Sequence, residues 1–292
     1  MRAFAVIFAL LLGVTAQAQP VPGFVQGPVA ASFTGAGDIV SSAVYWYSCA
    51  RAYSSATRGT KACNVCFETG GTDTACADVS SDASTGIVTI GTISGNTCGA
   101  NCTVKILYDQ TGNGNDATQA TVASRASIVA GAKGCAVAGG STSYLSPNLT
   151  GSTTQPLTVS YVAKRTSGTG FQTVHGNNNG TTGAFAGFGN SANTIGQYAG
   201  SAVQTAAGND NAFHAVQSIF NGSSSSMYVD GSSTASSPGP NFPASGSKVE
   251  LMNDTLGNPF TGSACEVGLW SGAFSGGNES SMNSNQHTFY GF

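Results

Sequence analysis

Short runs rich in Val, Ile, Phe and Tyr, separated by Gly, Asn and Ser, recur along the chain after residue 100. Runs of this length and composition are typical of β-strands, and their close spacing favours an antiparallel sandwich or barrel over alternating strands and helices. The predicted strands are 104–108, 158–163, 171–175, 184–188, 214–220, 226–229, 249–252 and 264–270.

Two predicted turns contain dipeptides that favour tight hairpins. Asn221-Gly222 follows the strand 214–220, and Asp230-Gly231 follows the strand 226–229. These residue types supply the positive φ that two-residue hairpin loops require. The closing stretch 279–292 predicts one short helix. This order resembles a laminin-G-like, concanavalin A-like sandwich, so the predicted fold is all-β: an antiparallel two-sheet jelly roll with one or two short helices and disulfides.

The segment before residue 100 shows a less regular pattern. Residues 36–60 contain few helix breakers before Gly59 and are the best helical candidate in the chain. Residues 60–100 are rich in cysteine and are expected to be irregular.

The first residues have the pattern of a secretory signal peptide. Arg2 supplies a positive charge, residues 3–14 are apolar, and Ala16-Gln17-Ala18 fits a small-residue cleavage pattern. We therefore expect a signal peptide at 1–18, an N-terminal lead at 19–35 and one β-sandwich domain at 36–292. The mature chain is expected to be secreted. No other stretch is long and apolar enough to cross a bilayer.

Composition excludes some classes of partner. Only 8% of residues are charged, and the formal net charge is −3. A chain with so few basic residues has no electrostatic footprint for nucleic acid or for anionic lipid.

The eight cysteines indicate disulfides in an exported chain. A zinc site would need further ligands near Cys63 and Cys66, and the three histidines stand alone in the sequence. No metal ion and no cofactor are therefore expected. Cys98 and Cys102 are close enough to close one loop, and a Cys66–Cys76 bridge is the second expected pair. The pairing of the other four cysteines stays open.

Three stretches carry a resemblance to a known family. Residues 102–120, CTVKILYDQTGNGNDATQA, join a strand to a Tyr-Asp-Gln-x-Gly-Asn-Gly turn. Residues 37–59 and 251–272 carry further matching positions, which in the first stretch are Asp38, Ile39, Cys49, Thr57 and Arg58. Together they resemble the catalytic domain of glycoside hydrolase family 54, the α-L-arabinofuranosidase B family. The resemblance implies a β-sandwich that removes terminal arabinofuranosyl groups with a Glu nucleophile and an Asp general acid.

Carried over residue by residue, the resemblance places the general acid at Asp254, allowing a one-residue shift. An Asn-Asp turn at the end of a strand is the alternative interpretation. The nucleophile position falls on Ala184, where no carboxylate is present. The adjacent Cys-Cys pair that the family has at the sugar site is absent, and Gly37 replaces another family cysteine.

Other polar residues are weaker candidates. Glu266 alternates along its strand so that it shares a face with Trp270, as a sugar-stacking cleft requires, although the favoured interpretation is a solvent-facing strand residue. Glu250 alternates with apolar neighbours and is expected to be exposed. Four polar residues in the glycine turn could contact sugar hydroxyls: Asp109, Asn113, Asn115 and Asp116. The preference of Asp and Asn for turns also explains them without a ligand.

The sequence therefore favours a secreted glycoside hydrolase that acts on an arabinose-containing glycan. The alternative is a non-catalytic carbohydrate-binding or adhesion sandwich that has lost the nucleophile. A second carboxylate within about 10 Å of Asp254 in a cleft would favour the enzyme, because glycosidases place their two carboxyl groups about 5–10 Å apart.

Overall fold

A computed structural model of the chain describes residues 32–140, 142, 144–146, 154–178, 183–205, 208, 211–235, 237–240, 248–254 and 257–292. The expected signal peptide and most of the expected lead lie outside these residues. Residues Phe33–Phe292 form one unit.

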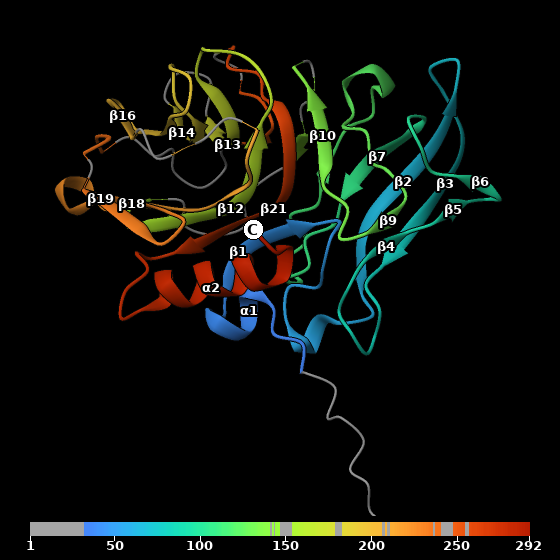
Figure 1. Cartoon of the computed structure of the whole chain (residues 1–292), viewed down its shortest axis with the longest axis horizontal. Helices are drawn as coiled ribbons and strands as arrows, with labels where there is room; N and C mark the ends of the chain where they lie inside the picture. The colour runs from blue at the N-terminus through green and yellow to red at the C-terminus, as the bar shows by residue number, and fades with distance from the viewer. Residues whose placement is uncertain are drawn as a thin grey trace, which may run out of the picture. The chain divides into compact units, whose positions relative to one another are not determined.

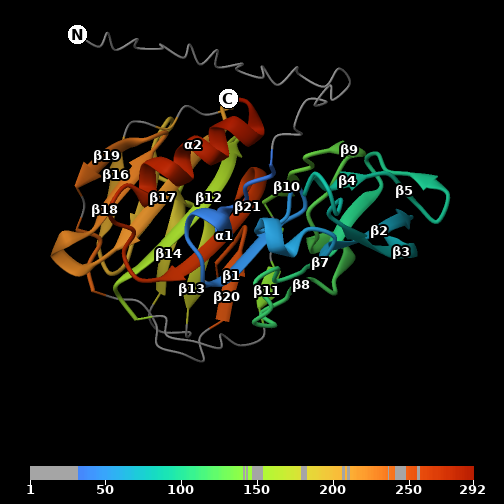
Figure 2. The same cartoon turned by 90° about the horizontal axis from the view of Figure 1, so that it is seen from below.

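The first of two large antiparallel sheets has the helices on its outer face (Figure 1). Its strand order is β1(Ala43–Ser48), β21(Thr261–Ser271), β12(Leu157–Arg165), β17(His214–Phe220), β18(Ser226–Val229) and β19(Ser232–Ala235), and β10(Ala136–Gly139) also pairs with β21. Helix α2(Asn278–Tyr290) runs across β17 and β12 on that face (Figure 2), beside the four-residue α1(Ala36–Ile39).

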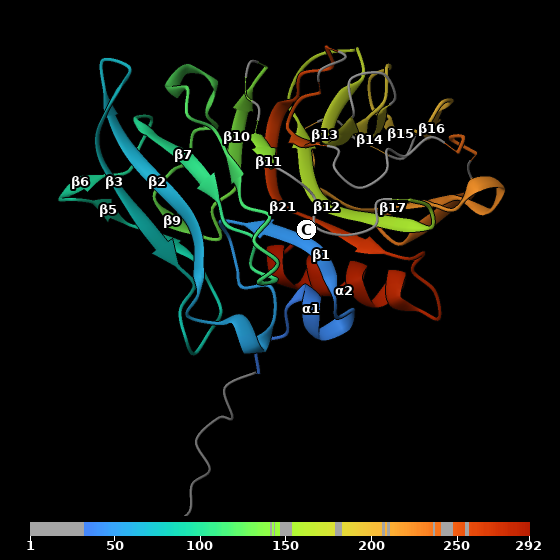
Figure 3. The same ribbon diagram turned by 180° about the vertical axis from the view of Figure 1, so that it is seen from behind.

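The second large sheet extends from β16 at one edge to β3 at the other (Figure 3). Its strand order is β16(Ala202–Thr205), β15(Ile195–Tyr198), β14(Gly183–Phe188), β13(Gln172–Asn178), β20(Lys248–Leu251), β11(Tyr144–Ser146), β8(Ala117–Thr118), β7(Cys102–Leu107), β2(Lys61–Thr69) and β3(Thr72–Ser80). The described residues also form two small strand pairs: β4(Thr89–Ile90) with β9(Gly131–Ala132), and β5(Thr92–Ile93) with β6(Asn96–Thr97). Three single-turn 3₁₀ helices are η1(Ser55–Thr57), η2(Val122–Ser124) and η3(Gly222–Ser224).

The core lies between the two large sheets and is formed by apolar side chains of both. Three tyrosines of the first sheet also cross it to polar groups of the other layer. Tyr45 bonds the ring of His175, Tyr47 donates to the Asn115 carbonyl, and Tyr161 donates to the Gly187 carbonyl. These arrangements confirm the predicted all-β sandwich with two helices and disulfides.

All eight predicted strands are present, with ends displaced by at most a few residues. The predicted closing helix is α2(Asn278–Tyr290), which is capped by Gly277 and Gly291, both in the left-handed region. The Asp230-Gly231 turn has the predicted positive φ at both residues. At Asn221-Gly222 only the glycine does, because the chain forms the 3₁₀ turn η3 there.

Two predictions for the first hundred residues are wrong. Residues 36–60 are helical only at Ala36–Ile39 and at the single turn η1, and Ala43–Ser48 is a strand buried along its whole length. Burial on both faces removes the alternation that identifies a strand, so periodicity cannot separate it from a helix. The expected irregular segment contains the hairpin β2–β3, whose turn is Gly70-Gly71 at positive φ.

Within the described residues, no helix is long and apolar enough to span a membrane.

Candidate functional site

A row of paired residues crosses the outer face of the ten-stranded sheet, on the side away from the core. Side chains of directly paired residues point to the same face of a sheet. Successive strand pairs connect the following residues: Asp78, Asn64, Ile106, Thr118, Leu145, Glu250, Gly176, Phe185, Tyr198 and Ala202. Gly176 is a gap in this row, with Glu250 on one side and Phe185 on the other.

Asp254 lies over the gap. A Cβ built on Gly176 would meet the Asp254 Cβ at 3.4 Å and the Asn253 carbonyl oxygen at 3.7 Å. Met252, at a φ of 63°, turns the chain from the end of β20 back over the outer face. Because paired Cα atoms of antiparallel strands lie roughly 4.5–5.5 Å apart, the Glu250 Cα lies within about 10 Å of the Asp254 Cβ.

Both acidic residues are largely buried. Glu250 is 3% exposed and Asp254 is 6% exposed. The expectation that Glu250 is exposed is therefore wrong: Glu250 lies on the outer face next to Gly176, over which Asn253 and Asp254 pack. The structure places these two acidic residues on the same face of the sheet, near Gly176.

The Asp254 carboxylate is held in one orientation by hydrogen bonds. The Thr173 hydroxyl donates to Oδ2 at 2.7 Å, and the Asn258 backbone N–H donates to Oδ1 at 3.0 Å. The Asn258 side-chain amide donates to both oxygens, at 3.1 and 2.9 Å. Side chains fixed in this way are typical of functional sites and equally of loop anchors.

Three aromatic rings lie beside the carboxylates on the same face. Phe185 stacks on Tyr198 with ring centroids 4.9 Å apart, and Phe171 meets Phe185 edge-on, also at 4.9 Å. Gly196 makes room for the Phe171 ring, since a Cβ there would lie 2.7 Å from it. Phe171 and Tyr198 are partly exposed. Such rings can offer an apolar face to a sugar while the carboxylates offer polar contacts.

Ala184, the position to which the resemblance carries the nucleophile, does not face this site. It is 1% exposed and belongs to the core between the sheets. Its cross-strand neighbour Asn177 points the same way.

Glu266 and Trp270 do share one face of β21, but α1 and α2 cover that face. Arg51 pairs with both Glu266 oxygens at 2.6 and 2.8 Å, and Gln286 and Tyr290 of α2 donate to the same carboxylate. The Trp270 indole N–H donates to the Val40 carbonyl. These contacts give both side chains a structural role. Both lie on the seven-stranded sheet, whereas Asp254 follows a strand of the ten-stranded sheet.

The turn 109–116 uses most of its polar atoms on neighbouring backbone. The Asp109 carboxylate accepts from the N–H groups of Trp46 and Asn115, and Asp116 accepts from the Asp109 N–H. The amides of Asn113 and Asn115 donate to carbonyls of β1.

The same turn also lines a surface pocket of about 330 Å³. Its lining includes Lys61, Tyr108, Asp109 and Asp116. This pocket lies at the β2–β7 end of the sheet and shares no lining residue with the Glu250–Asp254 site. The predicted sugar contact at the turn stays a prediction.

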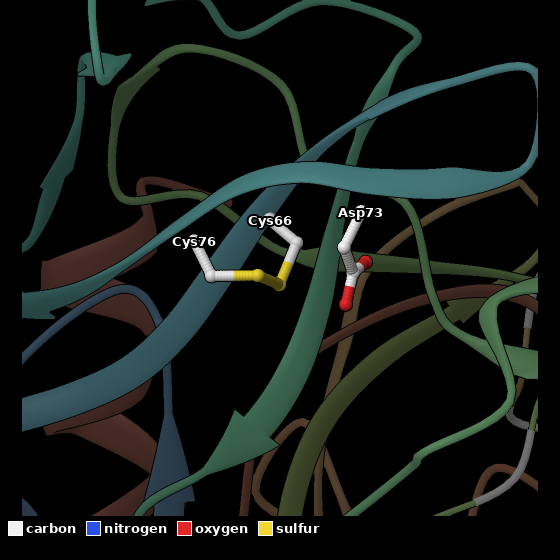
Figure 4. A group of neighbouring side chains, drawn as sticks. All are labelled: Cys66, Asp73 and Cys76. Atoms are coloured by element: carbon white, nitrogen blue, oxygen red, sulfur yellow. A yellow bond between two sulfur atoms is a disulfide. The ribbon is translucent and has the colours of Figure 1, made fainter.

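Three disulfides are present among the described residues. Cys66–Cys76 and Cys98–Cys102 are the two expected pairs, and Cys135–Cys265 joins residues 130 positions apart. Figure 4 shows the Asp73 carboxylate beside the Cys66–Cys76 bridge. Disulfide sulfurs are poor metal ligands, and Asp73 pairs with Arg125 and Lys105, which lower the pKa of its carboxyl. This cluster is therefore an ion-pair and disulfide site.

The chain matched no protein-family model and no curated protein. Solved structures do match. An arabinofuranosidase complexed with arabinofuranosyl-α-1,2-xylobiose has a TM-score of 0.63 at 19% identity. A family 54 α-L-arabinofuranosidase soaked with a cyclic sulfate inhibitor has a TM-score of 0.64 at 18% identity. Each match covers 86% of this chain and 64% of the other. The chain has the fold of these arabinofuranosidases. It spans less than two thirds of their length, and the feature that it shares with them is the fold.

Proposed function

We propose that the chain is a secreted glycoside hydrolase that removes terminal arabinofuranosyl groups from a plant-type glycan. The observation that carries the proposal is the placement of Glu250 beside Gly176 and of Asp254 over it, on one face of the sheet. The shared fold of family 54 arabinofuranosidases supports the substrate class.

In this proposal Asp254 is the general acid and protonates the glycosidic oxygen as the bond to the leaving group breaks. Thr173 and Asn258 fix the direction of its carboxyl group. Glu250 is the second carboxylate, either as nucleophile at about 5–5.5 Å or as general base for a water at about 6.5–9.5 Å. The sugar ring would pack against Phe171 and Tyr198, beside the two acids.

Hydrolysis of 4-nitrophenyl α-L-arabinofuranoside tests the proposal. Asp254→Asn and Glu250→Gln should each lower kcat/KM by roughly 10²–10⁴-fold, because each removes a proton-transfer or nucleophilic group without changing shape. Asp78→Asn is the matched control, since Asp78 lies in the same row of the same face, far from Gly176. Its activity should equal that of the wild type.

The proposal fails if the wild type does not hydrolyse aryl arabinofuranosides. It also fails if both variants, shown to be folded by their thermal transitions, keep activity within twofold of the wild type. Sequencing the N-terminus of protein exported by its own leader tests secretion, with a mature chain that starts near Gln19 as the expected result.

A non-catalytic carbohydrate-binding protein is the second candidate. The observation that favours it is Ala184, which is buried in the core where the resemblance expects a catalytic Glu. This candidate predicts calorimetric binding of arabinan oligosaccharides without turnover, and weaker binding in Tyr198→Ala and Phe171→Ala variants.

A further inference from the structure

Two cysteines, Cys49 and Cys63, carry free thiols, and both are buried. The other six cysteines form the three disulfides described above. An even number of cysteines in a disulfide-forming chain is typical of complete pairing. We infer that Cys49 and Cys63 form a fourth disulfide when the chain folds under oxidising conditions.

The two side chains point into the core from opposite sheets. Cys49 directly follows β1 of the seven-stranded sheet, and Cys63 lies on β2 of the ten-stranded sheet. Both belong to the same core cluster, and β1 contacts β2. Leu107, the cross-strand neighbour of Cys63, lines a small crevice together with Cys49.

The Cys63 thiol affects the ionisation of the Cys49 thiol. Burial raises the pKa of the Cys49 thiol well above its ordinary value, and a side-chain hydrogen bond with Cys63 raises it further. Both thiols also lie near the Tyr144 hydroxyl, whose pKa is raised mainly by burial. A crevice of about 20 Å³ lies beside Cys49, and a disulfide would bring the two sulfurs to roughly 2.05 Å.

The oxidant is a disulfide, either of a small thiol such as glutathione or of a dithiol oxidoreductase. One cysteine thiolate attacks the oxidant, forms a mixed disulfide and releases one thiol. The second thiolate then attacks the protein sulfur of the mixed disulfide and releases the second thiol. Two protein S–H bonds and one oxidant S–S bond become one protein S–S bond and two thiols. Since both cysteines are buried in the finished core, the exchange takes place before the sheets close.

The new bridge would differ from the other three in what it connects. Cys66–Cys76 joins two strands of one hairpin, Cys98–Cys102 closes a short loop, and Cys135–Cys265 ties the start of β10 to its neighbour β21. None of these bridges, all in the described part of the chain, joins the two large sheets. Cys49–Cys63 would join them.

Thiol mapping of the wild-type chain tests the inference. The full chain is folded in a glutathione redox buffer, denatured in guanidinium with N-ethylmaleimide and no reductant, and digested. The expected result is no maleimide adduct on any cysteine and a linked peptide pair that contains Cys49 and Cys63. The intact mass should be lower than that of the fully reduced chain by eight hydrogens.

Single variants give a second readout that does not depend on the linked peptide. Cys49→Ala should expose one thiol per denatured molecule, at Cys63, and Cys63→Ala should expose one at Cys49. Maleimide on both cysteines of the oxidised wild type would overturn the inference. A linked peptide that joins either cysteine to a different partner would overturn it as well.

Discussion

Replacing Glu266 by Gln tests whether the buried carboxylate beneath α2 is structural or catalytic. The side chains of Arg51 and Glu266 are 0% and 1% exposed, and they form a two-point ion pair. The substitution keeps the shape of the side chain and removes its charge. The Arg51 guanidinium would then be a buried charge with only neutral partners.

The expected cost follows from this burial. Removing one partner of a buried ion pair costs about 3–5 kcal/mol, because the remaining charge loses its compensation without regaining water. Solvent does not screen this ion pair, since neither side chain is exposed. A cost of this size lowers the melting temperature of a domain of this length by roughly 10 °C. The Lys61–Asp78 pair provides the contrast: its side chains are 59% and 33% exposed, and Asp78→Asn should cost at most about 1 kcal/mol.

Urea unfolding of Glu266→Gln, Asp78→Asn and the wild type measures these costs. A double variant, Arg51→Met with Glu266→Leu, should recover most of the loss, since an apolar pair can replace a buried ion pair at little cost. Below the melting temperature, kcat/KM of Glu266→Gln should match the wild type. A free energy of unfolding unchanged within about 1 kcal/mol would refute the structural role. Loss of activity in a fully folded variant would restore Glu266 as a catalytic candidate.

Two further outcomes are expected. Burial lowers the pKa of His175 to about 3, so below pH 6.5 the unfolded chain binds a proton that the folded chain cannot. As the pH falls from 6.5 to 3, this group should therefore lower the free energy of unfolding by about 1.4 kcal/mol per pH unit. Urea titrations at several pH values measure this contribution, which the His175→Gln variant should lack. Asp109→Ala should lower the free energy of unfolding by about 2–4 kcal/mol, because it leaves the buried N–H groups of Trp46 and Asn115 without acceptors. If folded Asp109→Ala also loses the sugar binding that calorimetry detects in the wild type, the turn contacts the sugar.

The strands that the sequence predicted correctly share one physical property. β17 and β18 are rich in β-branched and aromatic residues and end at turns with clear residue signals, so local chemistry alone defines them. β1 has the same kind of residues but is covered by the second sheet on one side and by the helices on the other. Its burial depends on parts of the chain that are far away in sequence, and a local pattern cannot contain that information.

The candidate site shows the same limit. Asp254 could be proposed from the sequence because a resemblance extends over its segment. Glu250 could not be paired with it, because alternation along a strand gives the face of a residue and says nothing of what covers that face. The register of β13 against β20 decides which residue lies beside Glu250 and beneath Asp254, and that residue is Gly176. Register is a property of two strands more than 70 positions apart in the chain.

The glycine turn 109–116 is evidence for the fold and not for the activity. Its Asp and Asn side chains hold the turn against β1 through backbone N–H and carbonyl groups. Those contacts require these residue types in this order whether or not the protein binds a sugar. A likeness in the turn therefore argues for the same sandwich and adds nothing about catalysis. Evidence for catalysis has to come from positions 184, 250 and 254, where the chain places one core alanine and two acids on the outer face.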